Sequence, residues 1–258
     1  MYYLICFIIF YLLYYWYTYY KNCKEDYKEE SKHINFLSKD DLLTILIKDE
    51  DKYYEKFYKK DLDVRNSKNI EEYKKLIKES VSDITEEEKN KLIQMINEIE
   101  NKILNIKIKW FDPIKFNKIK WNIGFVYGKK YEYGLSHTRN NVIILSKETL
   151  IEKDRQDLLR TLVHEKVHIY QKIYKQDVND YLQINNFKKI RKREENDMIR
   201  TNPDTDEWIY SDKNNNEYKA TYEKNSENLR DVIYSPCYEQ TCEHPFEKMA
   251  IEISNLMI

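Results

Sequence analysis

The sequence predicts an α+β fold in which helices and short strands occupy separate stretches of the chain. Residues 154–175 contain neither Gly nor Pro, and their apolar side chains recur at helical spacing. Residues 121–127 and 141–146 are instead rich in β-branched and apolar side chains, which is typical of strands. Helical patterns fill much of the region before these strands, so the two kinds of element do not alternate.

The first 20 residues predict a single transmembrane helix. This stretch is apolar and aromatic, carries no charge, and has the length of a tilted membrane span. A cleaved signal peptide would need a basic start and a small-residue cleavage site, and the sequence has neither. Positive side chains, which favour the cytosolic side, follow at once: Lys21, Lys24, Lys28 and Lys32. We therefore expect a single-pass membrane protein whose body faces the cytosol.

Residues 21–109 are expected to form a juxtamembrane segment and a helical region. Ser38 precedes one helical pattern, and Thr85 with Glu88 forms a capping box before another. Apolar residues follow at core spacing, namely Leu42, Leu43, Leu46 and Ile47 in the first and Leu92, Met95, Ile96, Ile99 and Ile103 in the second. We expect these helices to pack on the next domain, and a coiled-coil arm that binds a partner is the alternative.

His164, Glu165 and His168 carry the clearest chemical information in the chain. Two histidines four residues apart lie on one face of a helix, where they can share a metal ion. Neutral imidazole suits Zn²⁺, and a catalytic zinc site keeps three protein ligands and one open position. Zinc makes its water acidic, and a carboxylate that is not a ligand, here Glu165, takes the proton as general base. Lys166 falls within the apolar arc, where its stem is expected to snorkel to the surface.

A third metal ligand is expected in residues 243–250. Pro245 can open a helix there, and Glu247 would lie in its first turn. The small residue Ala250 would let this helix pack closely against the histidine helix. Glu243 and His244 also have ligand chemistry, so both remain alternatives to Glu247.

Four motifs together resemble the gluzincin branch of zinc metallopeptidases, and more specifically metallopeptidases encoded by large DNA viruses of eukaryotes. They are Gly-Leu-Ser-His-Thr-Arg at 134–139, Leu-Val-His-Glu-Lys-Val-His-Ile-Tyr-Gln at 162–171, Asn-Pro-Asp at 202–204 and Glu-His-Pro-Phe-Glu-Lys-Met-Ala at 243–250. The resemblance covers roughly Trp110 to Ile258. It implies a zincin-like metallopeptidase domain over residues 110–258, with Glu247 as the third zinc ligand beside His164 and His168.

In such a domain the strand beside the histidine helix is the sheet edge to which an extended peptide adds. We expect residues 141–146 to be this edge. His137 and Arg139 would then face the cleft and stabilise an oxyanion, and ordinary turn residues are the alternative interpretation.

The region between the two zinc helices is polar. Asn202-Pro203-Asp204 predicts a turn into a β-hairpin built from residues 208–222. The basic run at residues 188–193 is followed at once by acidic residues, and the net charge of the chain is −1. This pattern favours a solvated helix face over a nucleic-acid-binding patch.

These observations predict a membrane-anchored zinc metallopeptidase that acts on a protein or peptide substrate. The alternative is a membrane-tethered interaction protein in which zinc is structural, and hydrolysis of a non-peptide amide is a variant of the first hypothesis. Cys237 and Cys242, with four residues between them, could close a small disulfide or hold a metal, but a reducing cytosol favours free thiols.

Overall fold

The computed structural model describes residues 14–15, 33–236 and 242–257 of the 258-residue chain. The predicted membrane anchor at residues 1–20 lies outside the described residues except for Tyr14 and Tyr15. Within the described ranges, no helix is both long and apolar enough to cross a bilayer. The chain divides into Met1–Asn35 and a compact unit, Phe36–Ile258, which carries the candidate site. The predicted domain boundary between residues 109 and 110 stays a prediction.

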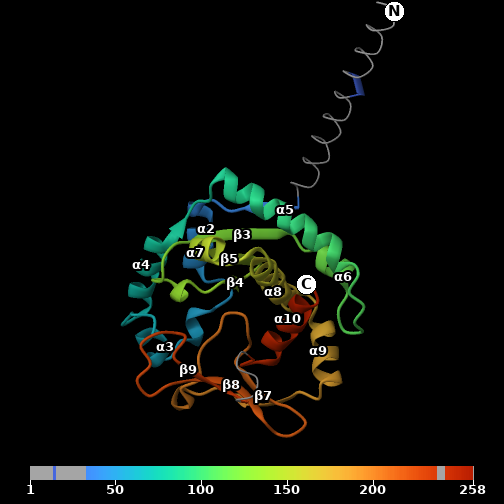
Figure 1. Ribbon diagram of the computed structural model, residues 1–258. Coiled ribbons are helices and arrows are strands. Elements are labelled where there is room, and N and C mark those ends of the chain that lie inside the picture. The colour runs from blue at the N-terminus through green and yellow to red at the C-terminus, as the bar shows by residue number, and fades with distance from the viewer. Residues whose placement is uncertain (1–13, 16–32, 237–241, 258) are drawn as a thin grey trace, which may run out of the picture. The chain divides into compact units, whose positions relative to one another are not determined.

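Helices dominate residues 33–118 (Figure 1). They are α2 (Lys39–Lys48), η1 (Tyr54–Lys56), α3 (Lys59–Asp63), α4 (Ile70–Ser80), α5 (Glu86–Ile103) and α6 (Pro113–Lys118), with the short strands β1 (Ile34–Phe36) and β2 (Val81–Ser82). The predicted capping box of α5 is confirmed, because the Glu88 amide donates to Thr85 Oγ1 and the Thr85 amide to the Glu88 carboxylate. All five predicted core residues of α5 are buried, and α5 packs against α8.

The first sheet has the strand order β1-β3-β5-β4, and β2 also pairs with β3. β3 (Trp121–Val126) and β5 (Val142–Ser146) are parallel, and β4 (His137–Arg139) is antiparallel to β5. The expectation that residues 141–146 form the edge is therefore wrong, because β5 lies between two strands. Asn140 adopts a left-handed φ of 53°, which turns the chain sharply and lets the three-residue β4 cover β5.

The long helix predicted from residue 154 is confirmed as α8 (Arg155–Ile173), between α7 (Lys147–Glu152) and α9 (Lys175–Ile184). Asp154 caps α8 by accepting a hydrogen bond from the Asp157 amide at 2.9 Å. α8 lies under β4 and β5 and beside α10 (Pro245–Asn255) (Figure 1). The snorkelling predicted for Lys166 is wrong, because this side chain is fully buried with its ammonium 4.0 Å from the Trp121 ring centre.

The second sheet has the order β6-β7-β8-β9. Its strands are β6 (Lys188–Lys192), β7 (Trp208–Ser211), β8 (Glu217–Tyr222) and β9 (Val232–Ser235), and the short helix η3 (Glu195–Asp197) follows β6. The predicted hairpin is confirmed as β7 and β8. The helix expected over the basic run is wrong: Asn186, with a φ of 58°, ends α9, and the run then pairs with β7 as an exposed edge strand.

Candidate metal centre

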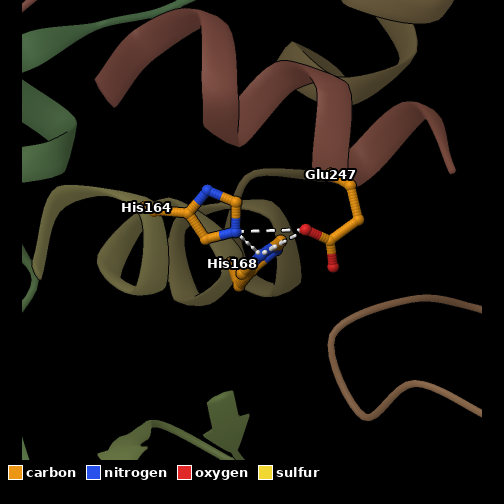
Figure 2. Close-up of side chains that lie close together, drawn as sticks. All are labelled: His164, His168 and Glu247. Atoms are coloured by element: carbon orange, nitrogen blue, oxygen red, sulfur yellow. Dashed lines mark hydrogen bonds and ion pairs between the residues drawn. The ribbon is translucent and has the colours of Figure 1, made fainter. Parts of the chain in front are cut away.

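Three side chains from two helices converge on one point. His164 and His168 extend from α8, and Glu247 extends toward them from the first turn of α10 (Figure 2). The two Nε2 atoms lie 3.0 Å apart, and Glu247 Oε2 lies 3.1 Å from that of His164 and 3.6 Å from that of His168. The sequence prediction of Glu247 thus agrees with its position in the fold.

The spacing of these atoms fits a tetrahedral metal ion. Zinc–nitrogen and zinc–oxygen bonds of roughly 2.0–2.1 Å at tetrahedral angles place ligand atoms about 3.3 Å apart. The three observed separations, 3.0, 3.1 and 3.6 Å, lie on both sides of that value. The described residues therefore contain a largely buried His-His-Glu group that could hold a metal ion.

The close approach of the two helices explains this convergence. Ala250, one turn after Glu247, is fully buried, and α10 packs along α8. Pro245 occupies the first turn of α10, where its missing amide hydrogen costs no hydrogen bond. His244 is the N-cap, since its Nδ1 accepts a hydrogen bond from the Phe246 amide at 3.1 Å.

The charges of the group reinforce one another. The pKa of Glu247 is well below its ordinary value: burial acts to raise it, but the imidazoles of His168 and His164 outweigh burial. The pKa of His168 is raised to about 10, because the charges of Glu247 and Asp204 outweigh the opposing effect of burial. The carboxylate is thus kept ionised, as a metal ligand must be.

Gln171 orients His168 and was not identified from the sequence. The His168 Nδ1 hydrogen donates to Gln171 Oε1 at 3.0 Å, so a metal ion that replaced the proton on Nε2 would find that nitrogen facing the other ligands. The amide of Gln171 in turn donates to the Phe246 carbonyl at 2.8 Å. Gln171 therefore joins α8 to α10 next to the candidate metal position.

Asn202 and Arg200 hold the acidic residues of this region. The Asn202 side-chain amide donates to Oε1 of both Glu247 and Glu243, at 2.8 and 2.7 Å. Arg200 donates to Glu243 Oε1 at 2.8 Å. Asn202 belongs to the Asn-Pro-Asp motif, for which the sequence predicts only a turn. The one signal for its contact with the glutamates is that this motif occurs together with the two ligand-helix motifs in the family resemblance.

Neither alternative third ligand joins the histidine pair. Glu243 is engaged by Arg200 and Asn202, and His244 Nε2 faces Asp206 Oδ1 at 3.1 Å. Both ring nitrogens of His244 are thereby in use, one in capping α10 and one at Asp206. Among the described residues, the group formed with His164 and His168 contains Glu247.

Glu165 borders a cavity of about 560 Å³ that His164 and Glu247 also line. Its side chain is nearly buried, and its Oε2 has no hydrogen-bond partner among the described residues. Burial raises the pKa of Glu165 well above its ordinary value, and the nearby Asp204 carboxylate adds to this rise. An unsatisfied buried carboxylate oxygen at a cavity wall is an acceptor suited to a ligand or a water molecule.

Asp204 lies in the turn that follows Asn202, and its side chain contacts the edge strand β4. Its Oδ1 accepts hydrogen bonds from the amide of Thr138, at 2.9 Å, and from the Thr138 hydroxyl. Lys172 donates to the Thr138 carbonyl at 3.2 Å. Both outward main-chain groups of Thr138 in β4 are therefore engaged by side chains, so an extended peptide could pair there only by displacing them.

His137 lines the same cavity as Glu165 and Arg139 does not, and the oxyanion role expected for the two residues stays a prediction. Arg139 is fully buried and donates to Asp49 and Asp51, each at 2.6 Å. The Nδ1 hydrogen of His137 donates to the Leu135 carbonyl, and its Nε2 accepts from the Tyr131 hydroxyl. The pKa of His137 is lowered by burial, and the neutral ring has no donor left for a substrate.

Cys242 is buried, and Cys237, its partner in the alternative disulfide or metal pair, lies outside the described residues.

The three comparisons with known proteins found no match: no protein-family model, no curated protein and no solved structure is detectably similar to this chain.

Proposed function

We propose that this protein is a zinc-dependent metallopeptidase whose catalytic group is His164, Glu165, His168 and Glu247. The observation that carries the proposal is the convergence of three ligand atoms within 3.6 Å of one another, beside a carboxylate that borders a cavity. Two imidazoles and a carboxylate with room for a fourth, non-protein ligand are the donor set of catalytic zinc sites. Peptide is preferred over other amides because of the motif resemblance.

The chain supplies the acid–base and positioning parts of this reaction. Zinc, when bound, would acidify a water molecule and polarise the scissile carbonyl. Glu165 would accept the proton of that water and deliver it to the amine that leaves, as a general base and then a general acid. Burial of Glu165, which raises its pKa, brings its proton affinity toward the range needed for both steps.

A structural zinc site in a membrane-tethered interaction protein is the alternative. Such a site has four protein ligands. Asp204 is the residue that would complete it, because ligand atoms of Asp204, His168 and Glu165 lie within 4.8 Å of one another. The engagement of Asp204 Oδ1 by Thr138 favours the catalytic arrangement over this one.

The decisive experiment compares the wild type with Glu165→Gln, with exposed Glu152→Gln as the matched control. Zinc content is measured by mass spectrometry, and proteolysis is measured by profiling new peptide ends in a whole-proteome digest. We expect Glu165→Gln to retain zinc and lose at least 10²-fold in cleavage rate. Zinc retention with undiminished cleavage would contradict the role of Glu165, and absence of cleavage by the zinc-loaded wild type would favour the structural alternative.

We further propose that residues 1–20 anchor the protein in a membrane with its body in the cytosol, on the sequence pattern described above. Added protease should digest the body of the protein in inverted vesicles and leave it intact in right-side-out vesicles. The opposite pattern would reverse the orientation.

A further inference from the structure

A second cavity, of about 630 Å³, lies on the other side of the Pro203–Asp204 segment from the metal centre. Pro203 and Asp204 line both cavities, so this segment separates them. The second cavity is lined by five lysines, Lys56, Lys172, Lys175, Lys189 and Lys192, and by the ring of Trp208. None of these residues takes part in the catalytic group.

The acidic residues that line the same cavity pair with two arginines and with two of the five lysines, so they do not neutralise the other three lysines. Asp51 pairs with Arg139 at 2.6 Å, and Glu207 pairs with Arg193 at 2.6 Å. Asp206 contacts Lys189 at 3.1 Å and His244, and Asp204 contacts Lys172 at 3.7 Å and accepts hydrogen bonds from Thr138. Within the part of the chain that the structure describes, Lys56, Lys175 and Lys192 have no carboxylate at ion-pair distance. The cavity therefore carries an excess of positive charge.

A β-bulge gathers two of these lysines on one face of β6. Side chains alternate along a strand, so Lys189 and Lys192 would ordinarily point to opposite faces. The register shifts between Lys189 and Arg191, and as a result Lys189 pairs with Tyr210 and Lys192 pairs with Trp208. The two ammonium groups lie 5.0 and 5.9 Å from the centre of the Trp208 ring. The local irregularity of the strand thus concentrates charge over one aromatic side chain.

We propose that this lysine-lined cavity binds an acidic segment of the polypeptide substrate, at a distance from the bond that is cleaved. The proposal rests on the proposed peptidase function, which supplies an extended chain passing from one cavity to the other. Lys56, Lys175 and Lys192, which pair with no carboxylate of the described residues, provide charge complementarity to an acidic peptide. The apolar ring of Trp208 can pack against aliphatic side-chain stems.

The test uses the full chain carrying Glu165→Gln, so that peptides bind without being cleaved. The probes are a decapeptide of alternating Glu and Gly and its matched Gln–Gly version, and the signal is Trp208 emission. We expect the acidic peptide to bind at least tenfold more tightly than its amide version and to change the emission, and this change should vanish in the Trp208→Phe variant. Equal affinity for the two peptides would overturn the proposal.

Paired lysine variants then locate the binding site. Lys175→Ala/Lys192→Ala should weaken binding of the acidic peptide at least tenfold. Lys213→Ala/Lys224→Ala removes the same charge from exposed positions that do not line the cavity, and should change affinity less than twofold. Equal weakening in both pairs would show only a general charge effect and would overturn the assignment.

Two further outcomes separate this inference from the proposed function. If a single-stranded oligonucleotide binds more tightly than the acidic peptide and the lysine pair abolishes that binding, the cavity is a nucleic-acid site and the proposal is wrong. If the wild type cleaves acidic and neutral peptides with equal kcat/KM, whatever the state of the lysines, the cavity assignment fails while the peptidase function stands. Acidic-peptide binding without any cleavage would instead count against the peptidase.

Discussion

The side-chain amide of Asn202 lies 2.8 Å from Oε1 of Glu247 and directs the other carboxylate oxygen at the two histidines. Its second hydrogen is donated to Glu243 at 2.7 Å, so one amide is held between two carboxylates. Asn202 comes from a loop far from both ligand helices in sequence. It is a positioning residue, because it orients a ligand without belonging to the metal-binding group.

Replacing Asn202 by Ala should weaken zinc binding by about 10–100-fold, the usual cost of losing a partner that orients a ligand. The measurement is a competition titration against a chromophoric chelator at fixed pH. Exposed Asn225→Ala is the control and should leave the affinity unchanged. An unaltered zinc affinity in Asn202→Ala would show that Glu247 is oriented without this hydrogen bond.

Glu247 and Glu243 should differ sharply in their effect on metal content. Glu247→Ala is expected to lose bound zinc on buffer exchange, since two imidazoles alone hold the ion weakly. Glu243→Ala should keep zinc and lose stability, because Arg200 is then left buried without its carboxylate. Zinc per chain and the zinc-dependent rise in melting temperature report the two effects. Full zinc occupancy in Glu247→Ala would remove this residue from the ligand set.

Lys166→Met should stabilise the protein by about 2–4 kcal/mol near neutral pH, because it removes a buried ammonium from an aromatic environment. Lys166 lies over the rings of Trp121 and Phe116, and its Nζ donates no hydrogen bond to a described residue. Burial lowers the pKa of Lys166 from 10.5 to about 7, although Glu100 acts in the opposite direction.

The sign of the pH dependence follows from that shift. Below pH 7 both the folded and the unfolded chain carry the proton, so the full cost of burying the charge is present. Between about pH 7 and 10.5 the folded lysine is neutral while the unfolded one is charged, so wild-type stability rises relative to Lys166→Met. Urea unfolding of both metal-free proteins from pH 6 to 10 measures the difference, and a gap that stays constant would contradict the shift.

Glu132→Gln should destabilise the fold by about 3–5 kcal/mol, because it leaves the buried Arg65 guanidinium with only the more distant Asp61 carboxylate, at 3.7 Å. Glu132 accepts hydrogen bonds from Arg65 Nε at 2.8 Å and Nη2 at 3.0 Å, and both side chains are almost inaccessible. The matched control is Glu79→Gln, which removes a surface ion pair with Lys130 and should cost less than about 1 kcal/mol. Equal urea midpoints for the two variants would show that the buried pair contributes no more than the exposed one.

Short-range patterns in the sequence were sufficient to identify several elements. The periodicity of residues 154–175, the capping box at Thr85 and the hairpin that became β7 and β8 all appear in the structure as predicted. The spacing of His164 and His168 needs only the pitch of one helix. Such features depend on neighbours within a few residues, which sequence pattern describes directly.

Edge positions and exposure could not be predicted in the same way. The three residues of β4 are too few to show alternation, so the sequence pattern indicates β5 as the edge, whereas in the structure β4 covers it. The basic run at 188–192 has no apolar period, and pairing with β7 made it a strand. Lys166 was expected to reach solvent, and packing of α5 and α6 against α8 buries it.

What the sequence determined by itself is therefore the local content of the site: a helix that presents two histidines and a glutamate, and a second helix that begins at Pro245 with Glu247 in its first turn. Only the tertiary structure decided that Glu247 faces the histidines, that Asn202 and Gln171 orient the ligands, and that lysines from α9 and β6 share one cavity. The physical reason is range. Helix periodicity and capping arise from contacts within one or two turns, whereas these arrangements depend on packing between segments that the sequence separates by tens of residues.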